Sequence, residues 1–348
     1  MLVPPGVSFA EAMTYPGQAS VSVRAVEWVR EHGGGGLVDR AENWWYTRNG
    51  PPSVGRPLDQ LGPALAQPPA RHHHRVDNLP ALPHHSGSKW LVASTDAAGH
   101  ALLYTALLHP DPRHIPVVAA AALIPQSRTV LHLNAGTREP VVGGQPSSRS
   151  MVPTSDRPYL IAAFNAGFKM KDSGGGWYSD GRQVLPLGEG FASLVIHRDG
   201  HATVQEWHRA DLGPDVVAVR QNLHLVVSGG ALAAGLGSSG SHLWGTSKNQ
   251  FQFTWRSGVG TDATGHLIYV AGRDLTLHSL ALAMTEAGIT TGMELDMHPQ
   301  MVSFTSFGTP TRAANAGTRL LRSIPTPASR YLVPDQRDFF YLTTKAAP

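Results

Sequence analysis

The stretch TTGMELDMHPQMVSF, residues 290–304, decides both the fold and the chemistry expected of this chain. Glu294, Asp296 and His298 occupy alternate positions in it, among apolar residues. In a β-strand, alternate side chains point to one face, so the three titratable groups would lie together. The apolar neighbours argue against a strand open to water, and they predict a strand that carries polar groups into a site.

This alternation allows three interpretations. In the first, the charged side chains form the solvated face of a strand. In the second, Glu294, Asp296 and His298 bind a divalent cation, since carboxylates and imidazole are common metal ligands. In the third, the carboxylates act at a sugar, where paired carboxylates are the usual catalysts. Apart from that possible cation, the sequence indicates no cofactor.

The composition predicts a β-rich globular protein. The chain has 348 residues, of which 41% are hydrophobic, and this is enough for a large core. The 37 glycines and 27 prolines indicate many turns. The absence of cysteine excludes disulfides and thiol nucleophiles. The net charge is only +3 and no Lys/Arg run is dense, so a nucleic-acid partner is not expected.

No stretch approaches the roughly 20 apolar residues that span a bilayer. The N-terminus MLVPPGVSF lacks the basic and apolar regions of a signal peptide. We expect an extracytoplasmic or secreted bacterial protein whose export segment is missing from this sequence, with a cytoplasmic protein as the alternative. The sequence does not indicate an oligomeric state.

We expect three regions along the chain. Residues 1–49 form an N-terminal helical and aromatic segment, in which Gly33–Gly36 end a helix and the aromatics of 42–52 anchor the segment on the body. Residues 50–88 are rich in Pro, Gly and His and read as a linker or loop. Residues 89–348 form one domain.

Alternating apolar runs predict most elements of that domain. We expect a hairpin around Asp199-Gly200, one buried strand over 216–230, and a helix over 276–288 that leads into the strand of the opening stretch. Further strands are predicted at 89–95, 100–109, 128–136, 159–168, on both sides of a turn within 251–272, and at 337–344. The predicted fold class is therefore α+β, with a mixed, β-rich sheet packed with helices.

Three other motifs offer polar groups at strand ends. FNAGFKM (164–170) places Asn165 at a strand mouth, and Gly167 allows close backbone approach; a structural turn is the alternative. TWRSGVG (254–260) offers Arg256, a planar fork for phosphate or carboxylate, unless it forms a surface ion pair. In VVSGGAL (226–232), Ser228, Gly229 and Gly230 form either an anion nest or a plain turn.

The order of these motifs along the chain resembles that in the phosphodiester glycosidase family over about residues 155–308, with weaker similarity back to about 89. The matching positions are Asn165–Phe168, Arg256 with Ser257, and Leu295-Asp296. The family's last motif is commonly Leu-Asp-Gly-Gly-Gly-Ser, and here MHPQMVS replaces the glycines. The resemblance implies motifs gathered at one mouth of the fold. The replacement of the glycines, in contrast, implies a different substrate or a lost activity, with His298 and Gln300 lining the pocket.

The resemblance implies a hydrolase that cleaves the glycosidic bond of a sugar 1-phosphodiester or a related envelope glycan. The departing phosphate monoester is a stable anion, so this reaction needs a carboxylate at the anomeric carbon and a fixed cation. We expect Asp296 and Arg256 to form that pair, with Glu294 beside them. A neighbouring carboxylate should raise the pKa of His298. The alternatives are a noncatalytic glycan-binding or envelope-assembly protein and a metal-dependent phosphodiesterase.

Overall fold

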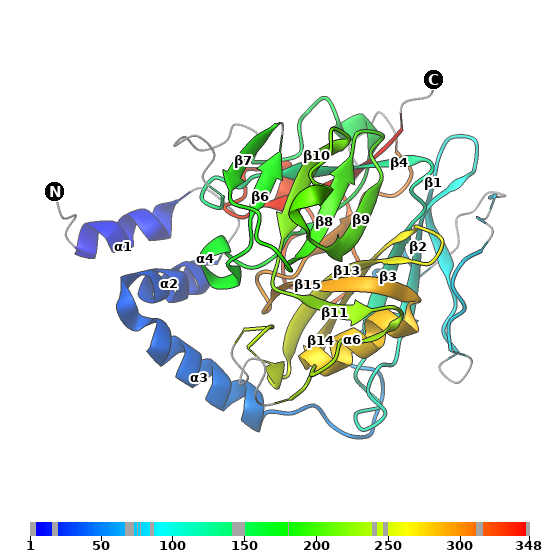
Figure 1. Cartoon of the computed structure of the whole chain (residues 1–348). Coiled ribbons are helices and arrows are strands. Elements are labelled where there is room, and N and C mark those ends of the chain that lie inside the picture. Colours follow the sequence, from blue (N-terminus) through cyan, green and yellow to red (C-terminus); the bar gives the residue numbers. More distant parts are fainter. Residues whose placement is uncertain are drawn as a thin grey trace.

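The computed structural model describes residues 5–15, 20–66, 73–74, 76, 78–83, 87–140, 150–179, 181–238, 242–245, 250–310 and 316–345. Helices at the N-terminus lie along one side of a β-rich body (Figure 1). The helices are α1 (Pro5–Thr14), α2 (Val21–Val29), α3 (Gly35–Arg48), α4 (Met170–Ser173) and α6 (Leu277–Glu286). The fold class is α+β, as the sequence predicts.

Three antiparallel sheets make up the described body. The eight-stranded sheet contains, in spatial order, β1 (Leu91–Thr95), β2 (Ala101–Leu108), β3 (Ala119–Ile124), β14 (Leu267–Leu275), β13 (Thr254–Asp262), β15 (Ile289–Met297), β11 (Leu225–Ser228) and β12 (Ala231–Leu232). One five-stranded sheet contains β7 (Arg182–Leu185), β6 (Trp177–Ser179), β10 (Val216–Gln221), β8 (Ala192–His197) and β9 (Ala202–Glu206). The other contains β17 (Thr318–Arg319), β16 (Phe304–Ser306), β5 (Leu160–Asn165), β18 (Phe339–Thr344) and β4 (Thr129–Asn134).

The eight-stranded sheet is the central layer because both of its faces are buried. On β3, Ala120 and Ala122 belong to the core shared with the two smaller sheets, whereas Ala119 and Ala121 belong to a second core that contains α6. Side chains that alternate between two apolar layers give a continuous hydrophobic run, and this is the pattern of strands covered on both sides. Figure 1 shows α6 packed on the outer face of this sheet.

Local sequence signals set the boundaries of α6. Thr276 caps its N-terminus by accepting a hydrogen bond from the Ser279 N–H, and Gly288 follows its C-terminus with a φ of +89°. Leu277, Leu280 and Met284 lie on the buried face of this helix. The helix therefore fixes where β15 starts, one residue after Gly288.

The N-terminal region agrees with the sequence prediction in one respect and differs from it in another. The predicted end of the first helical stretch is confirmed, because His32 and Gly33 leave the helical conformation and Gly33 has a φ of +88°. A separate helix, α3, begins directly after this kink at Gly35. The aromatics of α3 were expected to anchor it on the body, yet Trp44 and Trp45 are 58% and 57% exposed. That anchoring prediction is wrong for both tryptophans.

The segment 50–88 contains no helix or strand among its described residues, although it packs on the body. Leu61 and Leu65 are buried in the main core, and Leu61 forms an isolated bridge with Leu321. Whether the chain divides into domains at 49 and 88 stays a prediction.

Residues 216–230 form two strands instead of the single buried strand expected. β10 belongs to a five-stranded sheet and β11 to the eight-stranded sheet, and Leu223 between them has a φ of +47°. A change of sheet cannot be read from a run of apolar residues. Among the described residues, no helix has the length and hydropathy needed to cross a membrane.

Candidate active site

A β-bulge in β15 separates the two carboxylates of the opening motif. On β13, Arg256 pairs with Met297 and Gly258 pairs with Glu294, so β15 holds one more residue than β13 over this interval. An extra residue changes the direction of the side chains that follow it. The Asp296 N–H leaves the ladder and donates to the Ala166 carbonyl, 3.1 Å away, at the end of β5. The bulge therefore brings Asp296 to the junction of two sheets.

Glu294 is sealed inside the protein with Arg256. The Arg256 Nη1 lies 2.6 Å from the Glu294 Oε1, and both side chains are 2% exposed. The Arg256 Nε donates to the Leu275 carbonyl at 3.0 Å. Burial raises the pKa of Glu294, and Arg256 opposes that effect. The predicted pairing of Asp296 with Arg256 is not the pairing seen, because Glu294 takes this guanidinium.

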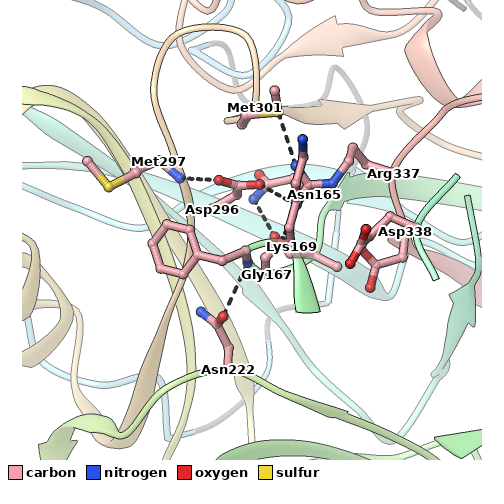
Figure 2. Close-up of polar contacts among 12 residues, drawn as sticks. Asn165, Gly167, Lys169, Asn222, Asp296, Met297, Met301, Arg337 and Asp338 are labelled. Carbon is pink, nitrogen blue, oxygen red and sulfur yellow. Dashed lines mark hydrogen bonds and ion pairs between the residues drawn. The ribbon is translucent and has the colours of Figure 1, made fainter. Parts of the chain in front are cut away.

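Asp296 instead pairs with Arg337, which lies two residues before β18. The Arg337 Nη2 is 2.9 Å from the Asp296 Oδ2 and also donates to the Gly167 carbonyl at 3.0 Å (Figure 2). The Met297 N–H donates to the Asp296 Oδ1 at 2.8 Å. Burial raises the pKa of Asp296 to about 6, although Arg337 and the Met297 N–H favour the charged form. A carboxyl with such a pKa changes protonation near neutral pH.

Asp296 and Arg337 line a cavity of about 510 Å³. The wall of the cavity that the β-rich body forms carries Asp296, Arg337 and Lys169, and the opposite wall comes from α2 and α3. The Lys169 ammonium contacts the carboxylate of Glu27 on α2 and lies 3.5 Å from that of Glu31. Burial alone would raise the pKa of Glu27, but Lys169 and Arg337 together lower it. This part of the cavity therefore stabilises negative charge.

A second buried ion pair holds the loop that carries Lys169. The Arg220 Nε lies 2.7 Å from the Asp338 Oδ2, and the Arg220 Nη2 donates to the Phe168 carbonyl at 2.6 Å. Asn222 supports the same loop by accepting a hydrogen bond from the Phe168 N–H at 3.2 Å (Figure 2). A Cβ on Gly167 would lie 2.8 Å from the Asn222 side chain, so only glycine fits there.

His298 lies beyond the end of β15, in a left-handed conformation with a φ of +77°. Strand alternation therefore does not extend to it. Its ring lies 5.8 Å from that of Tyr46, and its Nε2 is 3.8 Å from the Glu42 Oε2. Burial and the nearby Arg256 and Arg30 lower its pKa to about 3. The expected rise in its pKa is wrong, because nearby cations and desolvation outweigh the carboxylate.

The structure assembles Asn165 and Ser257 next to Asp296, but within the body. The Asn165 Nδ2 donates to the Ser257 Oγ at 3.0 Å, and that hydroxyl donates to the Asp296 carbonyl at 2.8 Å. The Asn165 Oδ1 accepts from the Tyr269 hydroxyl and the Ser303 N–H. These contacts support the end of β15, and substrate binding by Asn165 or Ser257 stays a prediction.

Of the remaining predicted residues, one lines the cavity and three lie far from it. Gln300 lines the cavity beside Asp296. Ser228, Gly229 and Gly230 are exposed, and the Gly230 N–H donates to the Thr290 carbonyl at the opposite end of β15. Within the described part of the chain, no three His, Asp or Glu side chains are grouped as metal ligands, so Glu294, Asp296 and His298 do not form the triad considered above.

Sequence reasoning missed Lys169 and Arg337, the two cations on the body side of the cavity. Lys169 stands in the FNAGFKM motif, two residues after the glycine of close approach. Arg337 is the first residue of the strand predicted at 337–344 and is followed by a second charged residue, Asp338. Charged residues at the boundary of a buried strand were the available signal, but nothing in the sequence indicates that β18 lies beside β5.

No family model matches the chain, and no curated protein matches it in sequence. Among solved structures, the catalytic domain of zebrafish N-acetylglucosamine-1-phosphodiester alpha-N-acetylglucosaminidase, auto-inhibited by its pro-peptide, is similar with a TM-score of 0.48 and 15% identity, over 86% of this chain and 97% of that one. A hypothetical protein from Synechocystis is similar with a TM-score of 0.41 and 10% identity, over 70% of this chain and 62% of that one. Likenesses at this level identify no reaction and no residue role in this chain.

Proposed function

We propose that the chain hydrolyses the bond between the anomeric carbon of a sugar and a phosphodiester. The observation that carries the proposal is the Asp296–Arg337 pair at the wall of a cavity of about 510 Å³, with Lys169 beside it. A carboxylate and two cations are the groups that this reaction requires, because positive charge develops on the sugar while negative charge leaves with the phosphate.

Asp296 acts in its ionised form at the anomeric carbon. In this role it either stabilises the oxocarbenium-like transition state by its charge, or attacks the anomeric carbon as the phosphate leaves, which gives a covalent glycosyl intermediate that water then hydrolyses. Arg337 keeps the carboxylate charged and oriented, since it opposes the effect of burial on its pKa. The C–O bond to phosphate breaks, water supplies the hydroxyl of the released sugar, and the phosphate monoester leaves with the bonding electrons.

Lys169 and Arg337 hold the phosphate in this proposal. The contact between Lys169 and Glu27 supports it, because a carboxylate from α2 already occupies a position that suits an anion. A substrate phosphate would compete with Glu27 for the same ammonium. This assignment transfers the phosphate-binding role expected of Arg256 to residues that line the cavity.

Isotope-labelled water separates this reaction from its alternatives. Purified protein is incubated in H₂¹⁸O with the methyl phosphodiesters of glucose, mannose and N-acetylglucosamine 1-phosphate, and the products are analysed by mass spectrometry. We expect the label in the released sugar and none in the phosphate. Label in the phosphate would identify a phosphodiesterase instead, and the absence of turnover on all three would contradict the proposal.

A further inference from the structure

A second cavity adjoins the one that contains Asp296. It has a volume of about 450 Å³, within the range of ligand-binding pockets of about 300–1,000 Å³. Tyr46 and Pro299 line both cavities. Its walls come from the C-terminal end of α3 with the turn that follows, and from the strands β13 and β14. A ligand that begins at Asp296 can therefore continue past Tyr46 into this space.

Aromatic side chains dominate one part of its lining. Trp45 is 57% exposed, although most large aromatics of this chain are buried, and Phe253 and Trp255 also line the cavity. An aromatic ring offers a flat apolar face with negative electrostatic potential. The C–H groups on the face of a pyranose ring are weakly positive and apolar, so they pack well against such a ring.

Polar groups suited to hydroxyls line the same cavity. Asn49 offers both a donor and an acceptor, and Arg273 and Asp274 form a partly exposed pair whose Nε–Oδ2 distance is 3.0 Å. Asp274 has a φ of +58°, a conformation that non-glycine residues adopt mainly at turns and functional sites. Planar polar groups beside aromatic faces are a combination that recognises neutral, hydroxyl-rich molecules.

We propose that this second cavity binds the sugar units that follow the reacting one, so that the physiological substrate is an oligosaccharide or polysaccharide. The proposal rests on the proposed function in one respect, since it takes the reacting sugar to lie at Asp296. It gives α3 a role in substrate binding, with Trp45 as the main stacking residue.

The chain offers a matched control for this role. Trp44 is adjacent to Trp45, lies on the same helix and is equally exposed at 58%, but it does not line the cavity. Its ring instead lies 5.5 Å from the guanidinium carbon of Arg48. Trp44→Ala and Trp45→Ala therefore remove the same side chain from the same exposed helix, and only the second removes it from the cavity.

The test measures binding of cellohexaose, maltohexaose and N-acetylchitohexaose by isothermal titration calorimetry. We expect at least one of them to bind, with affinity reduced roughly tenfold by Trp45→Ala and by less than about twofold by Trp44→Ala. Phe253→Ala, on the opposite wall, should also weaken binding. No binding by any of the three, or an equal effect of the two tryptophan variants, would overturn the proposal.

The outcome is distinguishable from failure of the proposed function. If a hexasaccharide binds in a Trp45-dependent way but no phosphodiester is hydrolysed, the sugar-binding role of the second cavity is supported and the proposed reaction is wrong. If hydrolysis depends on Asp296 while hexasaccharides do not bind, the proposed reaction is supported and the sugar-binding role of the second cavity is wrong.

Discussion

β15 contributes the carboxylates of two arginine–carboxylate pairs, Glu294 and Asp296, and the two pairs differ in what surrounds them. Glu294 and Arg256 are each 2% exposed, and the guanidinium also bonds to a backbone carbonyl. Asp296 and Arg337 are 10% and 12% exposed, and both line the cavity. Only the second pair can contact a substrate without a rearrangement of the core.

The comparison shows that burial alone does not identify a catalytic carboxylate. Burial raises the pKa of both acids, but Glu294 does not line the cavity, whereas Asp296 does. A buried pair that nothing else can reach stabilises the fold only while both partners are present. The two pairs should therefore respond to mutation in opposite ways, one in stability and one in activity.

The largest effect is expected from Asp296→Asn. The change is nearly isosteric and removes the charge, so turnover should fall by at least about 1,000-fold, or about 4 kcal/mol in the barrier. Urea unfolding should show a folded variant with a similar midpoint. Glu294→Gln is the matched control. If its loss of kcat equals that of Asp296→Asn with the fold intact, the contrast between the two pairs is broken.

Arg256→Gln should have the second largest effect, and it should be on stability. It leaves the Glu294 carboxylate buried without its partner, at a cost of about 3 kcal/mol in the free energy of unfolding. Urea denaturation at pH 7 measures this. A variant with wild-type stability that no longer turns over substrate would instead make Arg256 the phosphate ligand predicted from its motif.

Arg337→Gln should move the pH profile of kcat/KM. The ionised form of Asp296 is the active one, so wild-type activity should rise with pH around a midpoint near 6. Arg337 lowers this pKa, and its removal should shift the midpoint upward by about one pH unit. Arg128→Gln removes the same charge from an exposed pair with Asp96 and should leave the midpoint unchanged. An unmoved midpoint in Arg337→Gln would show that Asp296 does not control the profile.

His298→Gly should have the smallest effect on stability, within about 1 kcal/mol. Glycine relieves the φ of +77°, which offsets the lost contact with Tyr46. Because the pKa of His298 is lowered to about 3, the imidazole stays neutral between pH 5 and 8, and the variant's pH profile should superimpose on that of the wild type. Thermal unfolding and kcat/KM against pH check both points. If kcat/KM of the wild type changes with pH in this range and that of the variant does not, His298 titrates near neutrality.

Local patterns in the sequence predict the α+β fold well. Thr276, Gly288 and the apolar positions between them define α6, and Asp199-Gly200 defines the hairpin of β8 and β9. These signals depend on residues close together in the chain. The division of 216–230 between two sheets depends on distant partners, such as Met293 for Leu225, and it was not predicted.

The candidate site could be predicted only in part for the same reason. Asp296 was identified because its motif lies within one strand. Arg337 reaches Asp296 through the pairing of β18 with β5, although the two residues are 41 positions apart in the chain, and no local pattern encodes that contact. The pairing of Glu294 with Arg256 was missed because strand alternation assumes a regular register, which the bulge in β15 interrupts.

The extra residue of β15 also has a genetic consequence. Substitution changes the type of a side chain but leaves its register, whereas gain or loss of one residue shifts every later position by one. Deletion of a single codon between positions 294 and 297 would therefore remove the extra residue and return the strand to one regular alternation, an outcome that no substitution in this stretch produces.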